Sequence, residues 1–475
     1  MFDNFNTYRY VDLRFEPKGE TMAEGSEVLF FSSDSNLFIN IYNYASRTST
    51  LCWVMLITWL IAEVAFAVFI FGVVNPRIQQ LRPPNHQPYR RGSPLELVMQ
   101  IVKLIKSLTQ SYSFRKFCEG WFLGARIDDI KAGNVVSFLS WALFCDTPNG
   151  LSKENLDVVM TSVDIVQKEL NHRFEEGYNA EVTHCRFTHE QIPFIHRPLA
   201  FHAIAAAAEG AANFPFLRLR GFSRRRVNGI NYWIKTRSSS TKAPILLLHG
   251  ICSGWFFYSS LISMLTCDRT VVMIETDSIK IKSLVLDMPS PEEFVTNVKS
   301  VMQIHNIKQF SVIGHSFGSI MAAWLVKLSP QIISHLTLLD PVSLLLALPD
   351  VAYNFIYRSP TTIMEHAIFF MASRELTISK MLHRDFYWYN NMLYLDDVPA
   401  HIGVIIGIAG KDEVLNPSAL REYVINASKA SSSSHNRLHH LYWEDYSHGQ
   451  CLISTSALKE ISGLLDRNEA ALLKV

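Results

Sequence analysis

Two different hydrophobic patterns divide the chain. Residues 51–74 read LCWVMLITWLIAEVAFAVFIFGVV, an apolar run that contains a single charge, Glu63. After Val227, short apolar runs alternate with amphipathic stretches. The apolar runs lie in GINYWIKTR, APILLLHG, RTVVMIETD, FSVIGHS, HLTLLDPV, GVIIGIAGKD and LHHLYWED. Nearly continuous apolar strands separated by helices indicate a mostly parallel sheet with helices on both faces. The pattern therefore predicts an α/β domain over residues 227–470.

The apolar run at residues 51–74 predicts a single transmembrane helix. Its 24 residues would form a helix about 36 Å long, which exceeds the roughly 30 Å of a bilayer's hydrocarbon core. The run begins too late and is too long for a cleaved signal peptide. A buried core helix is the alternative. Glu63, as a charge in a membrane segment, is expected to pair within a helix dimer or to lie near water.

The charges beside the apolar run predict how the chain is oriented. Arg47 is the one basic residue within twenty positions before the run, whereas Arg77, Arg82, Arg90 and Arg91 follow it. Basic residues accumulate on the cytoplasmic side of membrane helices. The sequence therefore predicts that the domain after the apolar run faces the cytosol, with the endoplasmic reticulum or another endomembrane as the candidate location.

Three further segments surround the predicted helix and precede the α/β domain. Residues 1–50 form an N-terminal tail, residues 75–92 a basic, proline-rich linker, and residues 93–226 a helical region. Ser93, Pro94 and Glu96 form the pattern of a helix start with a capping box. The helix that follows is amphipathic. It is expected either to lie on the membrane surface or to pack on the main domain.

Composition excludes several functions. Lysine and arginine total 44 against 43 acidic residues, so the net charge of +1 gives no basic field for nucleic acid. The seven cysteines are scattered without a C-x-x-C pair, which argues against a zinc site or a disulfide framework. No G-x-G-x-x-G follows a predicted strand, which argues against a dinucleotide cofactor. The sequence predicts no cofactor, no metal and no nucleic-acid partner.

A glycine-flanked serine marks the candidate chemistry. Gly314-His315-Ser316-Phe317-Gly318 joins a β-branched run to a helical one. The two glycines could simply permit a tight corner, or the corner could present Ser316 as a nucleophile. Functional side chains collect at the carboxyl ends of parallel strands. Asp412 and His448 each follow a predicted strand, in the order serine, acid, histidine.

Each candidate residue has a chemical role. His448 would act as the base that removes the proton of Ser316, and Asp412 would orient and stabilise the imidazole. Asp340, at the end of LLDPV, is the alternative acid. The backbone N–H groups of Phe317 and Ile251 are the candidate oxyanion hole.

These motifs together resemble the α/β-hydrolase family, specifically its serine hydrolase branch. The resemblance covers roughly residues 227–465 and rests on LLLHG, GHSFGS, GKDEVLNP and YSHG. The layout with an N-terminal anchor is similar to that of poorly characterised membrane-anchored eukaryotic members. The sequence departs from the family after VVMIETD, where SIKIKSLVLDMPS replaces a glycine-rich turn. Family members insert a helical cap between the strand that ends in LLDPV and the strand that begins with GVIIG. The resemblance therefore implies a cap over about residues 343–398.

The segment at the cap position is rich in large apolar residues. An apolar cap over a nucleophile, on a chain tied to a membrane, favours an apolar substrate from the bilayer. The resulting hypothesis is a membrane-anchored serine hydrolase that cleaves lipid or acyl esters through an acyl-enzyme intermediate. Two alternatives stay open: a thioesterase or acyltransferase with the same triad, and a catalytically silent membrane scaffold of the same fold.

Overall fold

The computed structural model describes residues 35–81, 92–238, 240–251, 254–280, 286–430 and 438–472. The predicted tail up to residue 34, residues 82–91 of the predicted linker and residues 281–285 of the departure from the family pattern lie outside the described residues. The chain divides into two compact units, Met1–Ile61 and Ala62–Val475. The sheet, the cap and the candidate site all belong to the second unit.

The predicted membrane segment lies within a long helical stretch. Helix α1 covers Ser35–Phe69, a π-helical turn η1 follows at Ile70–Val74, and α2 continues over Asn75–Gln80. The part from Thr50 to Gln80 is long and apolar enough to cross a membrane. Within it, Ile70 and Ile78 are buried in a small cluster with Ile192 and Leu376. The helical stretch also extends six residues into the predicted linker, with Pro76 in the first turn of α2.

Glu63 has a partner that the sequence did not suggest. Its carboxylate accepts hydrogen bonds from the backbone N–H groups of Leu199 (2.6 Å) and Ala200 (2.7 Å). These two residues begin helix α7, Leu199–Leu219. The first N–H groups of a helix have no partner within it and attract negative charge. The expected roles of Glu63, in a helix dimer or near water, are therefore corrected: it caps α7.

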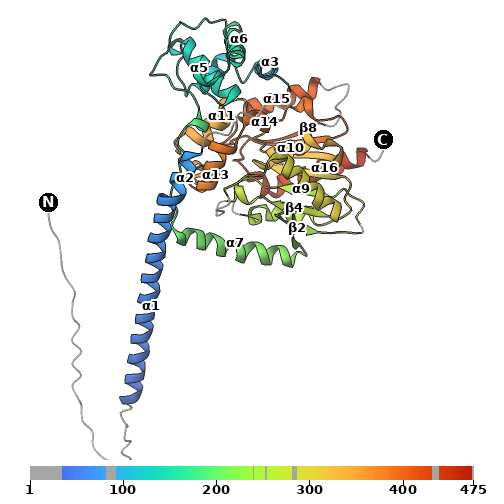
Figure 1. Cartoon of the computed structure of the whole chain (residues 1–475). Coiled ribbons are helices and arrows are strands. Elements are labelled where there is room, and N and C mark those ends of the chain that lie inside the picture. Colours follow the sequence, from blue (N-terminus) through green and yellow to red (C-terminus); the bar gives the residue numbers. More distant parts are fainter. Residues whose placement is uncertain are drawn as a thin grey trace, which may run out of the picture. The chain divides into compact units, whose positions relative to one another are not determined.

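An eight-stranded sheet forms the centre of the second unit, in the order β1-β2-β4-β3-β5-β6-β7-β8 (Figure 1). Strands β3 to β8 are parallel, whereas β2 pairs antiparallel with both β1 and β4. The strands are β1 (Ser223–Val227), β2 (Ile230–Lys235), β3 (Ile245–Leu248), β4 (Val271–Glu275), β5 (Phe310–His315), β6 (Ile333–Leu339), β7 (Gly403–Ala409) and β8 (Leu438–Trp443). The α/β fold with a mostly parallel sheet is confirmed.

The first strand, β1, lies before the predicted start of the domain at Val227. Asn228 and Gly229 have φ angles of +48° and +87° and form the two-residue turn between β1 and β2. An Asn-Gly pair is a typical hairpin turn because both residues tolerate positive φ. The exposed arginines of β1 hide the strand in a search for apolar runs, but this dipeptide was a usable signal.

Helices cover both faces of the sheet. The helices α8 and α16 pack on one face, and α9, α10 and α15 pack on the other. Their bounds are α8 (Ser259–Leu265), α9 (Pro291–Ile304), α10 (Gly318–Leu328), α15 (Pro417–Ala430) and α16 (Thr455–Leu472). Burial on both sides explains why the central strands are apolar at nearly every position.

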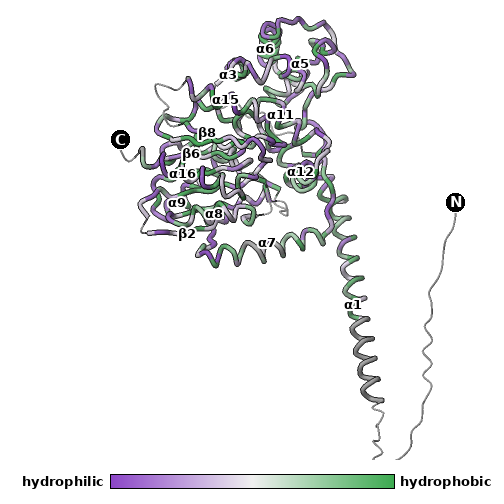
Figure 2. The backbone as a smooth tube through the Cα atoms, turned by 180° about the vertical axis from the view of Figure 1, so that it is seen from behind, coloured by the Kyte–Doolittle hydropathy of each residue, from purple (hydrophilic) through white to green (hydrophobic). Residues whose placement is uncertain are grey.

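The helical region has two parts on opposite sides of the domain. Helices α3, α5 and α6 gather on one side, whereas α7 runs along the edge that carries β2 (Figures 1 and 2). The first group comprises α3 (Pro94–Ser107), α4 (Phe114–Trp121), α5 (Ala132–Phe144) and α6 (Lys153–Leu170). Ser93 and Glu96 form the predicted capping box of α3. Leu97, Leu104 and Ile105 of α3 are buried in the same core cluster as the sheet, so α3 packs on the main domain, the second of the two expectations.

A helical segment lies between β6 and β7, where the cap was predicted. It contains α11 (Pro349–Ala352), α12 (Ile363–Ile368), α13 (Leu376–Lys380) and α14 (Trp388–Asn391), with π-helical turns after the first three. We call residues 341–402 the cap segment. Many of its apolar side chains join the same core cluster as α3 to α6 and the sheet. The cap segment thus lies between the helical region and the sheet, above the strand ends.

Candidate active site

The turn between β5 and α10 holds Ser316 in a strained conformation. Ser316 has a φ of +52°, which side-chain-bearing residues rarely adopt. A Cβ at Gly314 would lie 2.7 Å from the carbonyl oxygen of Gly318, and a Cβ at Gly318 would lie 2.2 Å from that of Leu248. Both glycines are therefore needed for the close approach of strand and helix. This geometry presents the Ser316 hydroxyl at the end of the sheet.

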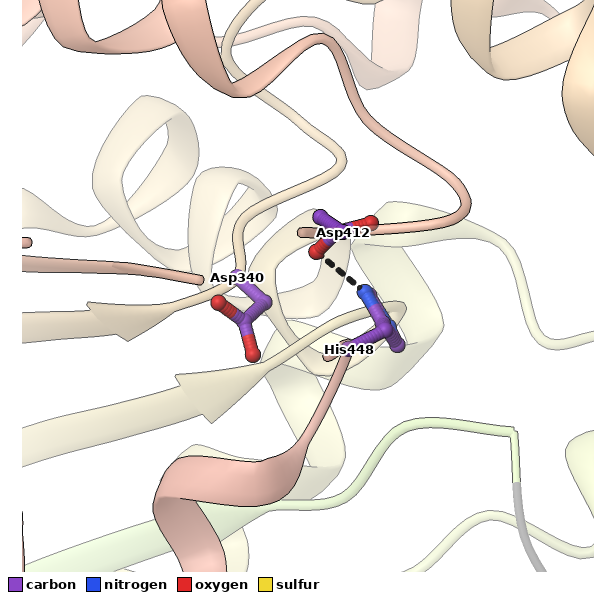
Figure 3. A group of neighbouring side chains, drawn as sticks. All are labelled: Asp340, Asp412 and His448. Carbon is purple, nitrogen blue, oxygen red and sulfur yellow. Dashed lines mark hydrogen bonds and ion pairs between the residues drawn. The ribbon is translucent and has the colours of Figure 1, made fainter. Parts of the chain in front are cut away.

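His448 lies between Ser316 and Asp412. Its Nε2 is 2.9 Å from the Ser316 hydroxyl oxygen, and its Nδ1 is 2.6 Å from Oδ2 of Asp412. Figure 3 shows the Asp412 carboxylate pointing at the ring. The other oxygen, Oδ1, accepts the backbone N–H groups of Val414 and Leu415, both at 2.8 Å. The carboxylate is thus fixed from both ends, and it holds the ring in line with the serine.

Asp340, the alternative acid, lies beside the same histidine but binds elsewhere (Figure 3). Its side chain is fully buried. Oδ1 accepts the N–H of Ala409 and Oδ2 accepts the N–H of Gly449, each at 2.8 Å. The carboxylate therefore ties the end of β6 to the loop that carries His448. It supports the backbone of that loop, whereas Asp412 contacts the ring.

These three side chains also satisfy a geometric test for metal ligation, since ligand-type atoms of Asp340, Asp412 and His448 lie within 4.8 Å of one another. The hydrogen bonds already use those atoms. Oδ2 of Asp412 and Nδ1 of His448 bind each other, and the Asp340 carboxylate accepts two backbone N–H groups. The arrangement fits proton transfer between histidine and serine better than it fits a metal ion.

The predicted oxyanion donors lie next to Ser316. Phe317 immediately precedes α10, so its N–H belongs to the first turn, where helical N–H groups have no intrahelical partner. Ile251 lines the same cavity as Ser316. The His249 side chain is buried and hydrogen-bonded at both nitrogens. The Thr276 N–H donates to its Nε2, and its Nδ1 lies 2.8 Å from the Gly250 carbonyl oxygen. These two contacts brace the loop after β3.

The surroundings of His448 favour its charged form. Burial by itself lowers the pKa of His448, but the charge of Asp412 and its hydrogen bond raise that pKa above the ordinary value of 6.5. Burial lowers the pKa of the neighbouring His315 well below 6.5, so this ring stays neutral. Burial raises the pKa of Asp340 to about 6, and the charge of Asp412 acts in the same direction.

This electrostatic arrangement predicts how activity depends on pH. His448 accepts a proton only when neutral, so a raised pKa keeps the inactive cation present at higher pH. We expect kcat/KM for an ester to rise with pH through an inflection above 6.5. The measurement is a pH–rate profile in the same detergent throughout. Asp412→Asn, which removes the stabilising charge, should move the inflection to lower pH, and an unshifted inflection would contradict the assignment.

An apolar cavity opens onto the serine. Its free volume is about 130 Å³. Ser316 and His448 line it, and every other lining side chain is apolar. Most of these side chains come from the cap segment. The site therefore places an apolar cavity beside a hydrogen-bonded serine, histidine and aspartate.

Two residues of the site escaped the sequence analysis. Glu413 accepts the backbone N–H of His448 at 3.0 Å, and its position beside Asp412 was an available signal. Trp121 lies nearly 200 residues before Ser316 in the helical region, yet it lines the same cavity. No motif marks it, because only the packing of α4 against the cap segment brings it there.

A comparison with family models identifies the fold of the sheet domain. Residues 243–407 match the family model described as the alpha/beta hydrolase fold. This part of the chain therefore has the α/β-hydrolase fold. The matched stretch contains Ser316 and ends before Asp412 and His448.

Several solved structures resemble the chain. A bacterial membrane phospholipase A has a TM-score of 0.41 and 14% identity, over 57% of this chain and 94% of its own. The enol-lactonase of Burkholderia xenovorans LB400 has a TM-score of 0.39 and 14% identity, over 51% and 100%. Naproxen esterase of Bacillus subtilis has a TM-score of 0.36 and 12% identity, over 55% and 97%. None of the curated proteins matches the chain in sequence.

Proposed function

We propose that this protein is a membrane-anchored serine hydrolase that cleaves lipid or acyl esters through an acyl-enzyme intermediate. The observation that carries the proposal is the hydrogen-bonded series Ser316, His448 and Asp412 at the wall of an apolar cavity. His448 takes the proton of the Ser316 hydroxyl as the oxygen attacks the ester carbonyl, and then gives it to the leaving alcohol. Water, activated by the same histidine, releases the acid.

The oxyanion formed during attack needs donors that are already in place. The N–H groups of Phe317 and Ile251 are assigned this role because one begins α10 directly after Ser316 and the other lies in the loop after β3. A Cβ on Gly250 would come within 2.8 Å of the Ser316 Cβ, so this loop passes close to the nucleophile. The glycine is therefore required for the loop to approach the carbonyl.

The segment from Thr50 to Gln80 supports a membrane location. Glu63, within this segment, caps α7. Apolar side chains on α7 are exposed as well, among them Ile204 at 70% and Phe214 at 49%. Exposed apolar side chains of this kind are typical of surfaces that bind a membrane or another protein. By the charge rule, the catalytic domain then faces the cytosol.

A covalent labelling experiment tests the proposal. Membranes that contain the full-length protein are washed with alkaline carbonate and treated with a short-chain alkyl fluorophosphonate. We expect the protein to stay in the membrane pellet and to gain one phosphonyl group, which peptide mass spectrometry should locate on Ser316. Loss of the protein into the wash would refute the membrane anchor alone.

The same preparation separates the alternative activities. An ester and a thioester with the same acyl chain are supplied with and without an alcohol acceptor, and the products are measured. Faster release of free acid from the ester supports ester hydrolysis. Faster reaction with the thioester favours a thioesterase, and transfer of the acyl group to the alcohol favours an acyltransferase. Folded protein that is neither labelled nor active would favour a silent scaffold.

A further inference from the structure

A second apolar cavity lies next to the first. Its free volume is about 50 Å³, and it is lined by side chains from α3, α4, α5 and α6, together with Ala347 and Trp388 of the cap segment. All the lining side chains are apolar or, for Cys118, a buried thiol. The cavity therefore lies between the helical region and the cap segment, away from Ser316.

The two cavities share part of their walls. Trp121 of α4 and Trp388 of α14 line both of them. The indole N–H of Trp121 donates to the carbonyl of Ala347, and that of Trp388 donates to the carbonyl of Ala142, each at 3.1 Å. Each indole is thus held by a backbone group from the opposite side of the interface. A ligand that extends from the first cavity into the second must pass these two rings.

We propose that the second cavity is the distal part of the acyl-binding site and that it takes the end of a long, unbranched acyl chain. This inference rests on the proposed function, because the chain is placed with its carbonyl carbon at Ser316. Its first methylenes then lie in the first cavity, and its tail passes Trp121 and Trp388.

The chemistry of the second cavity selects this occupant. A polar headgroup or hydroxyl in it would lose its hydrogen bonds to water without replacement, which is unfavourable. A methylene chain loses nothing of this kind and gains apolar contact with each added carbon. The helical region is therefore assigned a role in selecting chain length, in addition to its structural role.

The test compares a short and a long substrate in one detergent. The ratio of kcat/KM for p-nitrophenyl palmitate to that for p-nitrophenyl butanoate is measured in the full-length protein. Val102 lines the second cavity, so Val102→Phe should fill part of it. We expect this ratio to fall roughly tenfold or more, the change for about two methylenes that lose their apolar contacts. Butanoate hydrolysis should stay within about twofold, since a short chain ends in the first cavity.

A matched control separates the effect of filling the second cavity from the effect of destabilising the helical region. Val163 is equally buried in the helical region, at 4% exposure against 5% for Val102, but lines neither cavity. Val163→Phe should leave the ratio unchanged although it overpacks the same group of helices. If Val102→Phe does not fold, Ala142→Val, which adds less volume to the same cavity, should lower the ratio in the same direction.

Two outcomes would overturn the inference. One is an unchanged ratio in the folded variants that fill the cavity, and the other is an equal fall in Val163→Phe. Both differ from failure of the proposed function, in which the wild-type protein would hydrolyse neither ester and would not react with the short fluorophosphonate.

Discussion

Replacement of Ser316 by alanine is expected to lower kcat/KM for an ester by roughly 10⁴-fold or more, since loss of a triad nucleophile leaves only the weak contribution of binding and oxyanion donors. His448→Ala should cause a loss of similar size, because the serine then has no base. Combining both changes should cost little more than either alone, since the two residues act as a unit. Steady-state kinetics on detergent-extracted protein measures all three.

A buried serine away from the cavity supplies the control. Ser329 is fully buried at the end of α10, and its hydroxyl donates to a backbone carbonyl. Ser329→Ala should keep nearly all activity, and thermal melts should show that Ser316→Ala stays folded. If Ser316→Ala kept substantial activity while folded, the nucleophile would lie elsewhere.

The two aspartates should respond differently to the same substitution. In Asp412→Asn, the amide oxygen is expected to keep accepting the hydrogen bonds from the N–H groups of Val414 and Leu415. The amide NH₂ group then faces Nδ1 of His448. That contact forces the ring proton onto Nε2, where it cannot accept the serine proton. We expect a loss of about 10⁴-fold in kcat/KM with little change in thermal stability.

Asp340→Asn should act mainly on stability. Both oxygens of Asp340 accept hydrogen bonds from backbone N–H groups. In the asparagine variant, one of these N–H groups would face the NH₂ group, which is also a donor, and its hydrogen bond would be lost. A lost buried hydrogen bond costs about 1–3 kcal/mol of unfolding free energy. The loss of kcat/KM should be far smaller than for Asp412→Asn. The reverse order of the two catalytic losses would make Asp340 the triad acid.

The sequence left these two acids open for a physical reason. Asp340 ends β6 and Asp412 follows β7, and adjacent parallel strands deliver both to the same edge of the sheet. Period and spacing locate each strand end, but they do not determine which carboxylate meets the imidazole. That depends on the loops: the N–H groups of Val414 and Leu415 turn Asp412 toward the ring, whereas those of Ala409 and Gly449 engage Asp340.

Glu63 illustrates a second limit of sequence reasoning. Local pattern identifies a charge in an apolar helix and predicts that it needs a partner. The partner is the start of α7, more than 130 residues later in the chain. No local pattern encodes a contact at that separation. The two partners that the sequence suggested for Glu63, a second helix or water, therefore did not include the actual one.

The sequence by itself determined the α/β fold, most of the strands, the apolar helix and the serine in its glycine-flanked turn. Each of these depends on local periodicity or on steric needs within a few residues. Only the tertiary structure decided the contact of Asp412 with His448, the capping of α7 by Glu63 and the place of Trp121 in the wall of the active-site cavity. These features depend on how distant segments pack, and the packing of α4 and α5 against the cap segment creates cavities that no single segment contains.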